Sequence, residues 1–239
     1  IGPGCGEYIR RVFERNTSLR TLCLDKTGIL PLDISEMTRG LCENQSLMGL
    51  SLAYNIVGSE GGAALARAVE TNTALEVLNL SFTGLGTVGG CAILKSMLQN
   101  HQLSELNLCG AGLTCDCSRM IANVLQANTT LTNLDLSSNS LGPDSGDVIG
   151  TALRTKQALT GLHLTFNHLG GVGVHGIARG IEFNQSLRWL SLSTNGLGVK
   201  GAKSVANAIS HQRSLRELNL QFNPIGPVGA KALACIFRS

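Results

Sequence analysis

The chain has 239 residues, of which 43% are hydrophobic, 15% charged and 4% aromatic, and its formal net charge is +3. This composition excludes an ordinary disordered chain, and no apolar run reaches the roughly 18 to 20 residues that span a bilayer. The counts therefore predict a folded protein whose core consists mainly of aliphatic side chains.

The first predicted element is a helix within residues 7–18. Ile9 and Phe13 hold the positions that Leu65 and Val69 hold in a later helical segment. No strand precedes this helix, so the segment is either a half-repeat or a modest cap. At the other end the chain stops inside a predicted helix, residues 230–239. We therefore expect residues 1–239 to form one repeat domain that is part of a longer chain.

From residue 19 onward the pattern L-x-x-L-x-L returns every 28 residues, and each copy predicts a short strand. The eight copies begin at residues 19, 47, 75, 103, 131, 159, 187 and 215. The second half of each copy has helical spacing, as in Ala64, Leu65 and Val69. One such unit cannot bury its own apolar face, so stacking of the copies is expected.

Two asparagine positions recur within the repeat. The position after the strand holds Asn55, Asn139, Asn167, Asn195 and Asn223. An asparagine here is expected to form hydrogen bonds with backbone groups of the loop that would otherwise be buried without partners. The position that ends each helix, where a left-handed backbone conformation is expected, holds Asn44, Asn72, Asn100, Asn128 and Asn184.

The complete unit, N-x-[ST]-L-x-x-L-x-L-x-x-N-x-L-G-x-x-G-A-x-x-L-A, resembles the leucine-rich repeat of the ribonuclease-inhibitor type across residues 7–239. The resemblance implies an α/β horseshoe solenoid of eight 28-residue strand-turn-helix repeats, with a parallel inner sheet and outer helices. Similar arrays occur in NOD-like receptors, Ran GTPase-activating protein and ciliary proteins. These relatives share a curved binding surface rather than one reaction.

The resemblance and the residues together predict a non-enzymatic interaction module or scaffold. No nucleophile paired with a base, no paired carboxylates and no P-loop are evident, so we expect no enzyme activity and no cofactor. The resemblance leaves two alternatives open, a GTPase-activating regulator of a small Ran-like GTPase and the ligand-sensing region of a NOD-like receptor. An acidic tail such as that of the Ran-directed relative is absent from this sequence.

Two motifs suggest other chemistry. Residues 171–176 match G-x-G-x-x-G, a dinucleotide motif, but turn glycines recur at this place in the repeat and no acidic residue follows about 20 positions on. Cys109, Cys115 and Cys117 do not have the paired spacing of a structural zinc site. We expect neither nucleotide nor metal binding. The eight cysteines are interpreted as buried packing residues with free thiols, which suits the cytoplasm, with cilium or nucleus as alternatives.

Charge is distributed unevenly along the chain. Residues 1–150 carry a net charge of −5, and residues 151–239 carry +8. This asymmetry predicts that an acidic protein partner approaches the C-terminal half; a membrane or a nucleic acid is not the expected partner. The chain is alternatively one subunit of a larger assembly.

Outward-facing strand positions supply the candidate contacts on the concave and basic C-terminal surface. Trp189 is the single tryptophan and is either a binding hot spot or packed sideways on its neighbours Gly161 and Glu217. An aromatic column after the strands is either part of the interface or turn packing. The candidate residues are Trp189, Arg188, Arg216, Glu105, Asp135, His163, Glu217, Tyr54, Phe82, Phe166 and Phe222.

Overall fold

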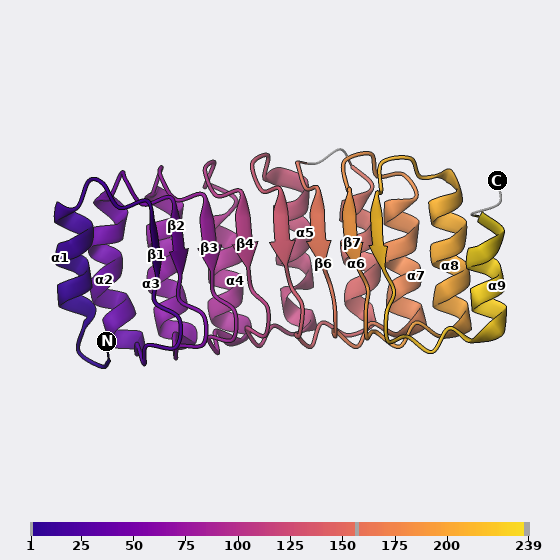
Figure 1. The fold of residues 1–239 in the computed structure, drawn as a ribbon, viewed down its shortest axis with the longest axis horizontal. Coiled ribbons are helices and arrows are strands. Elements are labelled where there is room, and N and C mark those ends of the chain that lie inside the picture. The colour runs from indigo at the N-terminus through magenta and orange to yellow at the C-terminus, as the bar shows by residue number, and fades with distance from the viewer. Residues whose placement is uncertain (1, 156–157, 237–239) are drawn as a thin grey trace. The chain divides into compact units, whose positions relative to one another are not determined.

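The computed structural model describes residues 2–155 and 158–236, and the chain divides into two compact units. Unit 1 comprises Ile1–Leu113 and Asn128–Leu134, and unit 2 comprises Thr114–Ala127 and Asp135–Ser239. Strands and helices alternate along the chain in both units (Figure 1).

The strands are three residues long: β1 Thr21–Cys23, β2 Gly49–Ser51, β3 Val77–Asn79, β4 Glu105–Asn107, β5 Asn133–Asp135, β6 Gly161–His163, β7 Trp189–Ser191 and β8 Glu217–Asn219. The α-helices are α1 Gly6–Arg15, α2 Pro31–Glu43, α3 Gly58–Thr71, α4 Gly86–Ser96, α5 Ser118–Ala127, α6 Asp144–Leu153, α7 Gly170–Ile181, α8 Gly198–His211 and α9 Gly226–Ile236. A 3₁₀ turn, η1, covers Cys115–Cys117.

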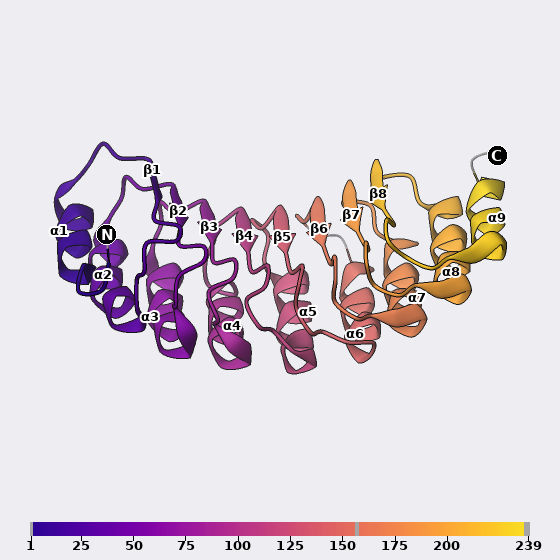
Figure 2. The same cartoon turned by 60° about the horizontal axis from the view of Figure 1, so that its bottom comes forward.

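The strands pair in parallel and in chain order within each unit. In unit 1, Leu22 pairs with Leu50, Leu50 with Leu78 and Leu78 with Leu106. In unit 2, Leu162 pairs with Leu190 and Leu190 with Leu218. Each pairing joins residues one repeat apart. Within each unit, helices cover one face of the strands (Figure 2). The predicted α/β architecture of parallel strands and helices is confirmed.

The core of each unit lies between the strands and the helices. Along β3 the burial alternates, because Leu78 is fully buried whereas the neighbouring Val77 is 38% exposed. The helices contribute the apolar stripe predicted from their spacing, and in α3 both Leu65 and Val69 are buried. One face of the sheet therefore points into the core, and the other remains available for contacts.

The asparagines at the helix ends do not adopt the left-handed conformation that the sequence suggested. Asn44 and Asn72 have extended backbones, with φ of −70° and −72°. Their side chains bond to the backbone of two repeats instead. The Asn72 amide nitrogen donates to Leu41 O at 2.7 Å, and its oxygen accepts from Leu75 N at 2.7 Å. These side chains join each helix end to the preceding repeat.

We expect Asn72→Ala to destabilise the protein by about 1 to 3 kcal/mol, because it leaves buried backbone groups without partners. Asn72 is 2% exposed, so water cannot replace the lost hydrogen bonds. Asn72→Asp retains the accepting oxygen and should lose less. Urea unfolding of the three proteins measures the difference, and equal midpoints would contradict a structural role for this asparagine.

The asparagines that follow the strands have the predicted role. The Asn55 amide nitrogen donates to Leu24 O at 2.7 Å and to Leu52 O at 2.9 Å. Its oxygen accepts from Thr27 N and Ile29 N, both at 3.1 Å. A single buried side chain thus satisfies backbone groups of two consecutive turns.

The glycine motif at residues 171–176 lies inside α7 and not in a loop before a helix. Its glycines serve close helix packing. A Cβ on Gly173 would lie 2.9 Å from Pro143 O, and a Cβ on Gly176 would lie 2.5 Å from Asp147 N, in α6. Glycine is therefore required because the backbones of α6 and α7 come close together, which accounts for the motif without a nucleotide.

The interpretation of the cysteines as buried packing residues is wrong for most of them. Among the eight, all of which lie in the described ranges, only Cys117 is buried, and Cys23, Cys115 and Cys235 are exposed. Cys23 occupies an outward strand position, which explains its exposure. Free thiols are present at Cys5, Cys23, Cys42, Cys115 and Cys235.

Candidate functional site

The exposed face of the unit 2 sheet brings several of the candidate residues together. Trp189, at the start of β7, pairs with Gly161 of β6 on one side and Glu217 of β8 on the other. Gly161 has no side chain and is itself buried. Of the next outward positions on these strands, Asn219 is partly exposed and Ser191 is buried. Trp189 is therefore the largest side chain among small neighbours.

Trp189 packs against a histidine one repeat away. The rings of Trp189 and His163 have centroids 3.7 Å apart and planes inclined by 35°. Both side chains are partly exposed. Burial lowers the pKa of His163, and the nearby Asp135 carboxylate acts in the opposite direction. The imidazole is therefore mainly neutral at pH 7, and the pair presents an aromatic surface rather than a charge.

This arrangement predicts the pH dependence of the emission from the single tryptophan. Protonation of the imidazole changes the environment of the indole, and the midpoint of this change should lie below about 6.5, the ordinary pKa of histidine. Asp135→Asn removes the influence that raises the pKa and should lower the midpoint further. Fluorescence recorded between pH 8 and 4 checks both. A midpoint above 6.5, or an unchanged curve in His163→Gln, would contradict the assignment.

Two arginines immediately precede the strand residues Trp189 and Glu217 in the chain. The Arg188 guanidinium donates from Nη1 to Ser214 O at 3.0 Å, which holds the side chain between two repeats. The Arg188 carbonyl accepts from Arg216 N at 2.7 Å and from Glu217 N at 3.0 Å. The side chains of Arg188, Arg216 and Glu217 are all exposed. Two exposed arginines and one exposed glutamate therefore lie next to Trp189 in the chain or on the paired strand segment.

The aromatic column lies in left-handed turns. Tyr54, Phe82, Phe166 and Phe222 have φ of 59°, 55°, 54° and 54°. In unit 1 the Tyr54 and Phe82 rings stack 4.9 Å apart, and Lys26 Nζ lies 4.5 Å from the centre of the Tyr54 ring. In unit 2 Phe166 packs on His168, whereas Phe222 is 83% exposed. The ring contacts of Tyr54, Phe82 and Phe166 are those expected of side chains that pack within the turns.

The remaining candidate, Glu105, belongs to unit 1, where its side chain is exposed on β4.

Among residues 2–155 and 158–236 no group of three or more His, Cys, Asp or Glu side chains could hold a metal ion. Across the same residues, no helix combines the length and apolarity needed to cross a membrane.

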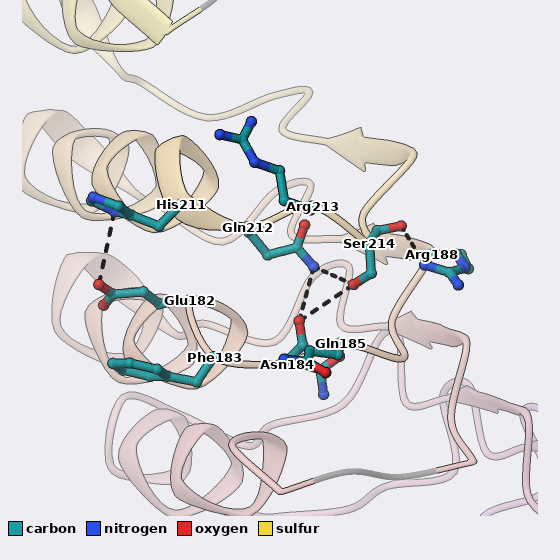
Figure 3. Close-up of a pocket in the computed structure, with 9 residues that line it drawn as sticks. All are labelled: Glu182, Phe183, Asn184, Gln185, Arg188, His211, Gln212, Arg213 and Ser214. Carbon is teal, nitrogen blue, oxygen red and sulfur yellow. Dashed lines mark hydrogen bonds and ion pairs between the residues drawn. The ribbon is translucent and has the colours of Figure 1, made fainter.

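The sequence interpretation missed a hollow on unit 2. It lies where α7 and α8 end, and its rim includes Phe183, His211 and Arg213 (Figure 3). Comparison of positions one repeat apart could have indicated Arg213, because this position holds Thr17, Gln45 and Thr73 in unit 1. The hollow itself depends on how the helix ends pack, which the sequence pattern does not describe.

Parallel strands with helices on one face, buried leucines 28 residues apart and an exposed polar face define a repeat solenoid built for contacts. Six segments match the Leucine Rich repeat family, at residues 43–66, 71–94, 127–150, 156–178, 183–206 and 211–234. They cover more than half of the chain, which therefore belongs to this family. The repeats are of the ribonuclease-inhibitor type.

One solved structure shares the fold over part of this chain. "Leiomodin-1 Actin-Binding Site 2 (ABS2)" aligns at 20% identity with a TM-score of 0.52, over 61% of this chain and 87% of that one. The tropomodulin C-terminal domain of Caenorhabditis elegans aligns at 15% identity with a TM-score of 0.36, over 86% of this chain and 92% of that one. Comparison with curated protein sequences finds no match.

Proposed function

We propose that the chain is a non-enzymatic interaction module that binds a protein partner on the exposed sheet face of unit 2. The observation that carries this proposal is the Trp189–His163 pair, whose ring centroids are 3.7 Å apart on a face of small polar side chains. A partly exposed tryptophan held in place by a neighbouring ring is typical of a binding hot spot. Its contact with His163 holds the indole in place before the partner arrives.

Charge supports the choice of unit 2. Residues 151–239 hold ten Lys and Arg against two Asp and Glu, a net charge of +8. Such an excess accelerates the approach of an acidic protein. Part of this charge is carried by the exposed Arg188 and Arg216, which immediately precede Trp189 and its strand partner Glu217. We therefore propose an acidic protein as the partner, either alone or as another subunit of a larger assembly.

The exposed thiols of Cys23, Cys115 and Cys235 support a reducing compartment, and we propose the cytoplasm.

The leiomodin-1 structure carries an actin-binding name, so actin is a sensible first protein to add to a binding assay. At 20% identity the likeness concerns the fold, and the choice of actin as a bait rests on convenience.

Capture of partners from an extract of the native cells tests the proposed surface. The parent chain, Trp189→Ala and Val77→Ala serve as baits. Val77 occupies the equivalent strand position in unit 1 and is 38% exposed, which makes it a matched control. We expect one or more proteins to be retained by the parent and by Val77→Ala and to be depleted about tenfold or more with Trp189→Ala. Equal recovery on all three baits would contradict the assignment of the surface.

A further inference from the structure

The hollow at the ends of α7 and α8 is a preformed depression of about 420 Å³. Its floor consists of three buried side chains, Asn184, Gln212 and Ser214. Gln212 Nε2 donates to Asn184 O at 3.2 Å and to Ser214 Oγ at 2.5 Å, and Gln212 Oε1 accepts from Leu215 N at 2.7 Å. Because these groups already have partners, the floor is rigid and a ligand would be held by the rim.

The rim carries hydrogen-bond donors that remain available. Within residues 2–155 and 158–236 the Arg213 side chain has no hydrogen bond, ion pair or ring contact. Arg188 uses only Nη1, in its bond to Ser214 O, so its other nitrogens are open. The two guanidinium groups extend in different directions from the floor (Figure 3). The acidic side chain of the rim, Glu182, has Oε1 3.9 Å from His211 Nδ1.

An aromatic side chain borders the same hollow. Phe183 is 54% exposed, and the Arg154 guanidinium lies 4.7 Å from the centre of its ring. The hollow therefore offers two separate cationic groups and one exposed apolar ring.

A second hollow, in unit 1, occupies the same place in the repeat. It measures about 350 Å³ and lies at the ends of α1 and α2. Arg20 there donates to Ser46 O at 2.9 Å, as Arg188 does to Ser214 O. The repeat geometry therefore produces the hollow itself. The charge of the lining differs, because Glu43 stands where unit 2 has His211 and Gln45 stands where it has Arg213.

We propose that the unit 2 hollow binds an acidic peptide segment of a partner protein, with carboxylates on Arg213 and Arg188 and an apolar side chain on Phe183. Guanidinium groups bind carboxylates through paired, charge-assisted hydrogen bonds. The carbonyl ends of α7 and α8 carry partial negative charge and oppose any bound anion, so the carboxylates must be held at the rim by the guanidinium groups. This inference rests on the proposed function, since it describes how the protein partner is recognised.

A dye-labelled peptide in which a phenylalanine is flanked by glutamates provides the probe. Fluorescence anisotropy at low ionic strength compares the parent with Arg213→Gln and with a double variant, His211→Glu with Arg213→Gln, which copies the unit 1 lining. We expect the single variant to weaken binding severalfold and the double variant about tenfold or more. Arg20→Gln, which removes an arginine from the unit 1 hollow, is the control and should leave binding unchanged. Unaltered thermal unfolding shows that the variants are folded.

Three results would overturn the proposal: equal binding by the parent and the double variant, equal loss in Arg20→Gln, or displacement of the peptide by an equal concentration of inorganic phosphate. The same peptide with lysines in place of the glutamates should not bind. If the acidic peptide fails to bind while Trp189→Ala still depletes a captured protein, the hollow is refuted and the proposed function stands. If the peptide binds and Trp189→Ala depletes nothing, the sheet face is refuted instead.

Discussion

Gly176→Ala should destabilise the protein by about 3 kcal/mol or more, although alanine is the better helix former by about 1 kcal/mol. The added Cβ would lie 2.5 Å from Asp147 N and 2.6 Å from Asp147 Cα. Both are backbone atoms of α6 and cannot rotate away, so one helix must move relative to the other within unit 2. The steric cost therefore exceeds the gain in helix propensity.

Gly201→Ala, in α8, is the matched control for this glycine. Its added Cβ would lie 3.1 Å from Leu197 Cβ and 3.4 Å from Gly171 Cα, contacts that a shift of a few tenths of an ångström relieves. We expect this variant to remain within about 1 kcal/mol of the parent. Urea unfolding measures both changes. A Gly176→Ala variant as stable as the parent would contradict the close packing of α6 and α7.

Leu78→Ala should cost about 2 to 5 kcal/mol, because it removes a fully buried side chain and leaves a cavity between the strands and helices of unit 1. Its neighbour Val77 faces outward and is 38% exposed, so Val77→Ala should change the stability by less than about 1 kcal/mol. The two substitutions are adjacent on β3 and differ in the face on which they lie. Similar losses in both variants, measured by urea unfolding, would show that the sheet does not have the described inner and outer faces.

The leucine pattern predicted the strands and helices because each repeat places the same side chains against the same neighbours. Leu50, Leu78 and Leu106 are 28 residues apart and pair directly, so the pattern of a single repeat describes the same contact in several repeats. The role of Asn55 followed in the same way, since its position repeats and its amide can both donate and accept.

Details that depend on backbone direction or on distances between helices were not predictable. A polar residue at a helix end suggests a left-handed cap, but Asn72 instead keeps an extended backbone and lets its side chain bond to two repeats. The glycines of α7 match a nucleotide motif, and only the close approach of neighbouring backbone, such as Asp147 at Gly176 and Leu197 at Gly171, shows that they serve packing. The exposure of Cys23 likewise follows from the strand face that it occupies.

The candidate site was predictable in part. Strand alternation identified Trp189 and His163 as outward residues, but their contact depends on side-chain conformations that a sequence pattern does not specify. Arg213 was missed because it follows the helix, outside the strand positions from which the candidates were chosen. Comparison of the equivalent positions in the two hollows, Gln45 in unit 1 and Arg213 in unit 2, reveals the difference in charge.

The central claim is that a protein partner binds the exposed sheet face of unit 2. The most direct test is to measure the rates at which the protein associates with a captured partner and dissociates from it across a salt series. Arg216→Glu should slow association more than Arg67→Glu, an exposed reversal on α3, because attraction to the partner is screened within about 8 Å at physiological salt. Trp189→Ala should instead raise the dissociation rate, because it removes buried contact area. Association that is independent of salt, together with a Trp189→Ala variant that dissociates like the parent, would contradict the account.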